Sequence, residues 1–164
     1  MLGNTYDKQN CSAARALEVV GERWSLLIMR DSLFRGMTRF SEFERSLDIA
    51  PNILIKRLGA LVDAGLLAQR PRLQDGETLH YFPTEKGMDI KAVIIALTSW
   101  GDKWAAPNGA PVFFQHKECL GRIEIATKCA KCGIAPAFTE INAAPTKSKA
   151  KKAKSNAKKK RPGS

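Results

Sequence analysis

Four short elements between residues 38 and 82 limit the possible folds of this chain more than any other feature. They are expected in the order helix 39–47, helix 51–62, strand Leu67–Leu73 and strand Thr78–Pro83. Pro51 suits the first turn of the second helix, where its missing N–H costs nothing. Asp75-Gly76 is a pair favoured in tight β-turns. The order helix, turn, helix, hairpin predicts a winged helix-turn-helix, which places an exposed helix beside a hairpin.

The second helix of this unit has an apolar stripe and a polar face. Leu54, Leu58 and Leu61 recur at helical spacing and should be buried. Asn52 and Lys56 then point away from them, as an amide that can bind adenine and a cation that can bind guanine or phosphate. An ordinary amphipathic surface helix would show the same pattern. The hairpin that follows favours DNA as the partner.

Arginines on the hairpin suit contact with a nucleic-acid backbone or minor groove. Arg70 and Arg72 are two residues apart on one predicted strand, so both side chains can point the same way. The alternative is a pair of solvated arginines on an edge strand. The complete set of residues expected to contact DNA is Arg39, Ser41, Asn52, Ile53, Lys56, Arg57, Arg70 and Arg72.

The net charge of +11 is unevenly placed. Residues 146–164 hold nine of the 27 Lys and Arg residues and no acid, which leaves 18 basic and 16 acidic residues before them. Such a composition predicts a disordered tail over 141–164. Two roles are open for it: a sequence-independent hold on nucleic acid, or a solubilising tail. The near-neutral body means that specific contacts should be local to the helix and hairpin.

The remaining helices suggest a core and a dimer interface. Helices are expected over Ser12–Val20 and Glu22–Phe34, the latter apolar nearly all round and therefore central. A third, Glu85–Trp104, carries apolar residues every three or four positions, including Trp100 and Trp104. This stripe either packs inside the domain or pairs two subunits, and we expect a homodimer. The predicted fold class is α+β, mainly α.

Several function classes find no support. No apolar stretch is long enough to span a membrane, and residues 1–10 lack a signal-peptide core. We therefore expect a cytoplasmic, nucleoid-associated protein. With two histidines, no glycine-rich phosphate loop and no paired carboxylates, the chain is not expected to be an enzyme.

Three cysteines and a histidine follow the long helix. Their spacing is His116-x2-Cys119, nine residues, then Cys129-x2-Cys132-Gly133. A Cys3His set of this kind fits a structural zinc site, since all four ligands come from protein. A redox CxxC pair and unligated thiols are the alternatives. Arg122–Ala126, between the pairs, could form a short strand.

Four blocks of this sequence resemble the HxlR-type transcriptional regulators, winged helix-turn-helix relatives of the MarR group. The blocks are Cys11–Leu17, Gly21–Asp31, Arg39–Phe43 and Ala50–Leu58, and the resemblance runs to about Trp104. It implies a homodimer that binds double-stranded DNA at a partly palindromic operator and regulates a nearby gene. An RNA-binding or protein-interaction module is the alternative function.

The resemblance also implies a role for Cys11. Some members of the family use a cysteine just before the first helix to sense oxidants, aldehydes or quinones. A position near a helix N-terminus, with Arg15 one turn on, favours the thiolate. The alternative is a small buried apolar residue. The expected organisation is thus a DNA-binding and dimerisation domain over 11–105, a Cys/His segment over 106–140 and a tail over 141–164.

Overall fold

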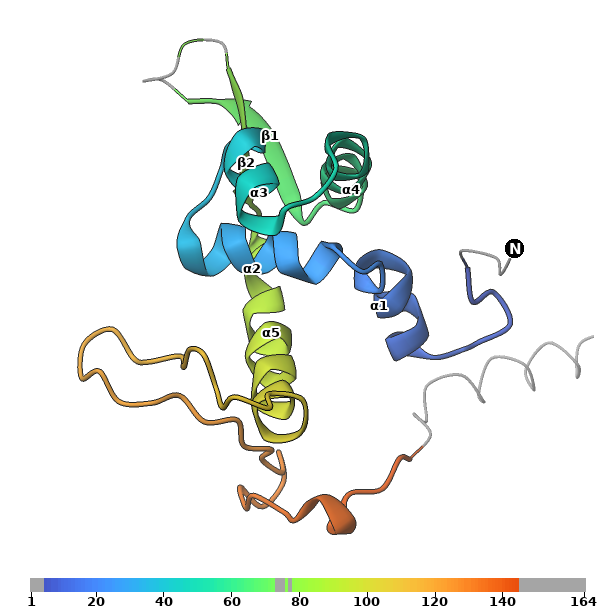
Figure 1. The fold of residues 1–164 in the computed structure, drawn as a ribbon. Coiled ribbons are helices and arrows are strands. Elements are labelled where there is room, and N and C mark those ends of the chain that lie inside the picture. The colour runs from blue at the N-terminus through green and yellow to red at the C-terminus, as the bar shows by residue number, and fades with distance from the viewer. Residues whose placement is uncertain (1–4, 73–75, 77, 145–164) are drawn as a thin grey trace, which may run out of the picture. The chain divides into compact units, whose positions relative to one another are not determined.

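The computed structural model describes residues 5–72, 76 and 78–144 (Figure 1). Its contacts divide the chain into two compact units, one through Ile125 and one from Ala126. All the α-helices and β-strands of the described residues belong to the first unit. The lysine-rich stretch 146–164 and Asp75 of the predicted turn lie outside the described residues. None of the helices in the described part is long and apolar enough to cross a membrane.

The first unit has the predicted fold, mainly α with a small antiparallel hairpin. Its elements are α1 (Ser12–Val20), α2 (Ser25–Arg35), α3 (Phe40–Leu47), α4 (Pro51–Asp63), β1 (Leu67–Pro71), β2 (Leu79–Pro83) and α5 (Glu85–Trp104). The predicted bounds of α1 and α5 are confirmed. Helix α2 begins later than Glu22, because Ser25 donates to the Glu22 carbonyl at 3.0 Å and closes a turn there. Figure 1 shows α4 and the hairpin at one end, with α5 extending away from them.

Helix α2 lies at the centre of this unit, as predicted. It contacts α3, α4, α5 and β2, and its Ile28 and Met29 are fully buried. The core around them is completed by Phe43, Leu54, Leu58, Leu61, Leu66, Leu67 and Ile94. The predicted stripe of α4 is therefore buried, and its opposite face is available to solvent. Each such side chain contributes roughly 1.5–3 kcal/mol when fully buried.

Local contacts define both ends of α3 and the start of α4. Glu42 accepts from the backbone N–H groups of Thr38 and Arg39 at 2.8 and 2.9 Å and so caps the start of α3. The same contacts lower the pKa of the Glu42 carboxyl, the Arg39 N–H first and the Thr38 N–H second. Asp48 ends α3 in the left-handed region, with φ of 48°. The chain then enters α4 at Pro51, with helical N–H groups bonded to the Ala50 carbonyl.

Strand β2 is hydrogen-bonded to the segment before α3, and the residue that follows β2 caps α5. In β2, Tyr81 donates to the Thr38 carbonyl at 2.8 Å, and the buried His80 Nδ1 lies 2.9 Å from Thr38 Oγ1. At the far end Thr84 caps α5 by accepting from the Gly87 N–H at 3.1 Å. A Cβ at Gly87 would overlap the Leu66 carbonyl oxygen, so α5 approaches the start of the hairpin as closely as glycine allows.

After α5 the chain forms an open loop rather than the expected strand. Gln115 and Arg122 make a single antiparallel bridge, and Ile123 donates to the Phe114 carbonyl at 2.8 Å. Phe114 packs on Phe34 of α2, with ring centroids 4.5 Å apart. The segment 106–125 therefore folds within the same unit as the helices. The second unit contains the Cys129–Gly133 turn and a short 3-10 helix, Phe138–Glu140.

Candidate nucleic-acid interface

The exposed face of α4 carries the side chains that the sequence assigned to base contact. Asn52 and Lys56 are one turn apart and exposed, opposite the buried stripe of Leu54, Leu58 and Leu61. The small Gly59 and Ala60 on this side are also exposed and leave room for close approach. The polar face of α4 is therefore open to solvent.

Ile55 of α4 is exposed, although it was not among the predicted contact residues. Ile55 is 61% exposed, more than Ile53 at 39%. Ile55 follows Leu54 directly, so it lies about 100° round the helix from the buried stripe. That angle was available from the sequence. A branched apolar side chain at such a position can contact a thymine methyl group.

Three further predicted residues lie at the start of α3 and on α4 itself. Arg39 and Ser41, at the start of α3, are exposed. Arg57 is half-buried, and its Nη2 lies 3.3 Å from the Glu22 carboxylate. Glu22 precedes α2, so this ion pair joins segments that are distant in sequence. Arg57 thus has an intramolecular partner that periodicity could not reveal.

The two predicted arginines of the hairpin differ in setting. Arg70 is in β1, where its guanidinium lies 4.4 Å from the centroid of the Phe82 ring. Arg72 is exposed and follows the last residue of β1, Pro71. β1 therefore ends two residues before the predicted bound of Leu73, and the common direction of the two arginines stays a prediction. Strand β1 itself lies at the same end of the unit as α4 (Figure 1).

A buried carboxylate holds α2 against α3. Asp31 is fully buried and lies 2.8 Å from Arg30 Nη2 and 3.4 Å from Arg35 Nη1. Ser46 of α3 donates to Asp31 at 2.7 Å and accepts from Arg35 at 3.0 Å. These four residues are called the Asp31 cluster below. The cluster was not predicted from the sequence, although an acid with basic residues at i−1 and i+4 is a signal for it.

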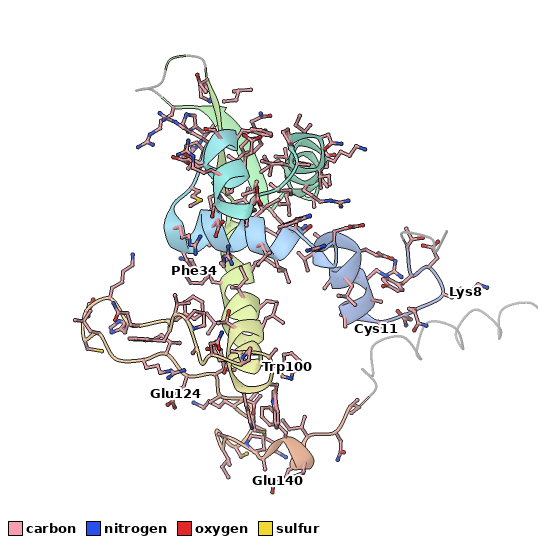
Figure 2. All side chains as sticks on the ribbon, in the orientation of Figure 1. Lys8, Cys11, Phe34, Trp100, Glu124 and Glu140 are labelled. Atoms are coloured by element: carbon pink, nitrogen blue, oxygen red, sulfur yellow. The ribbon has the colours of Figure 1, made fainter. Side chains whose placement is uncertain are left out.

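One face of α5 is apolar and is exposed in the part of the chain that the structure describes. Val93, Leu97, Trp100 and Trp104 recur at helical spacing and are exposed, the tryptophans at 61% and 66%. Figure 2 labels Trp100 on α5. These residues are called the apolar face of α5 below. Exposed tryptophans on one stripe are unusual on a surface that meets only water.

Cys11 lies directly before α1 and is exposed rather than buried (Figure 2). No side-chain hydrogen bond of normal geometry caps α1. The N–H groups of Ala14 and Ala13 nevertheless face the sulfur and lower the pKa of the Cys11 thiol, with a smaller contribution from Arg15. Arg15 is itself paired with Glu18 at 2.8 Å. The sensing role of Cys11 stays a prediction.

The C-terminal cysteines and His116 form two close pairs, His116 with Cys119 and Cys129 with Cys132. In the first unit, His116 Nδ1 lies 3.2 Å from Cys119 Sγ. In the second, the N–H groups of Cys132 and Lys131 face the Cys129 sulfur and lower the pKa of its thiol. Within the described residues, no group of three or more His, Cys, Asp or Glu is placed to hold a metal ion. The zinc site of His116, Cys119, Cys129 and Cys132 stays a prediction.

Comparisons with known proteins agree on the type of protein. The family model described as HxlR-like helix-turn-helix matches residues 19–109. The uncharacterized HTH-type transcriptional regulator Rv3095 of Mycobacterium tuberculosis is 41% identical over 123 residues, covering 74% of this chain and 77% of that protein. Such relatives are transcriptional regulators rather than enzymes.

Solved structures extend the likeness beyond the helix-turn-helix. The crystal structure of PA1607, a candidate transcription factor, has a TM-score of 0.77 at 31% identity, covering 85% of this chain and 98% of that one. PA1374 of Pseudomonas aeruginosa, another candidate transcription factor, has a TM-score of 0.60 at 37% identity, covering 89% and 99%. The reduced form of the transcriptional regulator YodB from B. subtilis has a TM-score of 0.51 at 26% identity, covering 61% and 99%.

Proposed function

Because this chain belongs to the HxlR-like helix-turn-helix family of transcriptional regulators, we propose that it is a homodimer that binds a partly palindromic operator in duplex DNA. The observation that carries the proposal is the exposed face of α4, with Asn52 and Lys56, beside the arginines of the hairpin. In this arrangement α4 enters the major groove and the hairpin follows the neighbouring backbone or minor groove.

The roles of the side chains differ in this proposal. Asn52 and Lys56 contact base edges, with Ile53 beside them. Arg39, Ser41, Arg57, Arg70 and Arg72 contact phosphate or the minor groove and fix the register of the protein on the duplex. Arg57 exchanges its ion pair with Glu22, at 3.3 Å, for a phosphate. Such contacts give affinity without sequence preference and weaken as salt rises.

The apolar face of α5 supports the dimer in this proposal. Two copies that pair through this face bury the exposed tryptophans and carry two α4 helices related by a two-fold axis. The segment before Ser12 and the exposed Leu17 of α1 belong to the same interface in this proposal. Half-sites about one helical turn apart, roughly 34 Å, match such a dimer.

The test is selection of bound sequences from a randomised duplex library, with Asn52→Ala and a matched control, Asn108→Ala. Asn108 is an exposed amide in the loop after α5. Wild type and control should select the same two-fold site. Asn52→Ala should lose preference at one position per half-site, at a cost of roughly 1–3 kcal/mol.

Two results would contradict the proposal. An unchanged preference in Asn52→Ala would mean that the face of α4 does not read bases. Selection of single-stranded RNA over duplex DNA by the wild type would favour the RNA-binding alternative, which needs exposed aromatic stacking platforms. The exposed tryptophans of this chain stand on α5, not on α4 or the hairpin.

Reaction of Cys11 with an electrophile or oxidant is the proposed input to this regulator. The thiol is exposed, and its lowered pKa raises the fraction of reactive thiolate near neutral pH. The likeness to a regulator whose reduced form has been solved points to the same chemistry. An adduct at Cys11, beside the proposed interface, would alter the spacing of the two α4 helices.

A further inference from the structure

A pocket of about 630 Å³ lies between α2, α5 and the segment 111–123. Its volume is in the range of small-molecule sites. The rings of Phe34 and Phe114 form an apolar wall, with centroids 4.5 Å apart and planes tilted by 44°. Figure 2 labels Phe34 at the end of α2, beside α5. The pocket was not foreseen from the sequence, because its walls come from three separate segments.

The charges at this pocket have one sign. Arg30, Arg35, Lys91 and Lys117 line it, and no acidic residue does. Lys91 is half-buried, and its Nζ lies 5.7 Å from the centroid of the Phe34 ring. Asp31, behind the wall, offsets part of the charge of the two arginines. A pocket with an aromatic wall and an excess of cations complements a flat apolar molecule that carries an anionic group.

The pocket and the apolar face of α5 are on different sides of that helix. Lys91, Ile95 and Thr98 line the pocket. Val93, Leu97 and Trp100 lie two residues further on, so each is about 200° round the helix from its counterpart. A second copy of the chain on the apolar face therefore leaves the pocket wall of α5 uncovered.

We propose that this pocket binds a small aromatic carboxylate. The ring lies against Phe34 and Phe114, and the carboxylate pairs with Lys91 and Arg35. Arg35 also connects this site to α3, α4 and the hairpin, which together are called the reading end below. This part of the proposal rests on the proposed function. Arg35 donates to Ser46 of α3 at 3.0 Å, so a ligand that draws Arg35 away from the Asp31 cluster loosens α3, which precedes α4.

Binding to the pocket is tested without DNA, using 2-naphthoate and the full-length protein in isothermal titration calorimetry. One site per chain is expected. Lys91→Glu should weaken binding by at least about tenfold, because a charge-assisted contact becomes repulsive. The matched control is Lys103→Glu, a charge reversal on α5 outside the pocket. Circular dichroism verifies the fold, and Lys91→Gln, with no repulsion, should give an intermediate loss.

The neutral analogue 2-naphthalenemethanol separates charge from shape. It should bind at least about tenfold more weakly than 2-naphthoate, since it cannot pair with Lys91 or Arg35. Equal binding of the two compounds, or equal loss in Lys91→Glu and Lys103→Glu, would overturn the site. An absence of any heat at millimolar 2-naphthoate would overturn it as well.

Coupling to DNA is measured separately, by titrating the selected operator with and without saturating 2-naphthoate. A change of roughly tenfold in operator affinity is expected, and the operator should change the affinity for 2-naphthoate by the same factor. Lys91→Glu should abolish this change and Lys103→Glu should keep it. Lys91-dependent binding with no change in operator affinity would overturn the coupling. Failure of all DNA binding would refute the proposed function, while the calorimetry would still decide the pocket.

Discussion

The reading end of the first unit and its long helix α5 present opposite surfaces. Around α3, α4 and the hairpin, polar and basic side chains surround a closed apolar core. On α5 the exposed stripe is apolar instead, with Trp100 and Trp104 more than half exposed. The apolar residues of the first region are buried within one chain. On α5, by contrast, apolar side chains stay in contact with water unless a partner covers them. The fold of the reading end should therefore depend on internal contacts, and the state of α5 on association.

The largest effect is expected on α5. Replacing both Leu97 and Trp100 by Glu should convert the protein to monomers, because burying two carboxylates in an apolar interface has no compensating partner. Sedimentation velocity at micromolar concentration measures this. Ala92→Glu is the matched control, since Ala92 is exposed on the same helix away from the apolar face. A persistent dimer in the double variant would place the interface elsewhere and remove the contrast between the two regions.

The next effect is expected in the Asp31 cluster, which joins α2 to α3 of the reading end. Asp31→Ala should lower the free energy of unfolding by about 3 kcal/mol, because Arg30, Arg35 and Ser46 lose their shared carboxylate. Both arginines are partly exposed, which places the value at the low end of the range for buried pairs. Urea unfolding measures the loss, with the exposed Asp89→Ala as control. Equal losses of unfolding free energy in the two variants would show that the Asp31 cluster stabilises the fold no more than an exposed aspartate does.

The sequence predicted most of the fold because its signals are local. Pro51 begins α4 as expected, Leu54 and Leu58 are buried, and α5 has its predicted bounds. Each of these depends on residues only a few positions apart, which is the range over which helical periodicity operates. The exposure of Asn52 and Lys56 follows from the same periodicity. Their contact with DNA is a prediction that the operator selection decides.

The features that the sequence did not predict are contacts between residues that are distant in sequence. Arg57 pairs with Glu22, and Phe114 packs on Phe34, across separations that no local pattern encodes. The strand expected over Arg122–Ala126 is reduced to one bridge at Gln115 and Arg122. β-pairing depends on a partner strand more than on intrinsic preference, so a short isolated run is a weak predictor.

A smaller effect is expected at Glu42, which stabilises the reading end by capping α3 rather than by burial. Glu42→Ala should cost about 1 kcal/mol, because the N–H groups of Thr38 and Arg39 lose their acceptor. The pKa of Glu42 is lowered on folding, so its charged form stabilises the fold above the ordinary value of 4.5. That stabilisation disappears as pH falls through the lowered pKa.

The matched control is Glu44→Ala on the same helix. Chemical unfolding at pH 7 and at pH 3 measures both variants. The difference between wild type and Glu42→Ala should be large at pH 7 and shrink in acid, whereas Glu44→Ala should show no such change. A loss that is the same at both pH values would assign Glu42 a packing role.

The smallest effect, and the one that links the two regions, is at Cys11. Its thiol should react with 1,4-benzoquinone faster than those of Cys119 and Cys132, because its pKa lies below the ordinary value of 9.0. Each tenfold gain in thiolate is offset by a roughly threefold loss of nucleophilicity, so the reaction rates should differ less than the thiolate fractions do. Peptide-resolved mass spectrometry of the full chain at pH 7 measures the rates. Treated wild type should then lose operator affinity and treated Cys11→Ser should keep it; loss in both would transfer the response to the C-terminal cysteines, with Cys129 and its lowered pKa first among them.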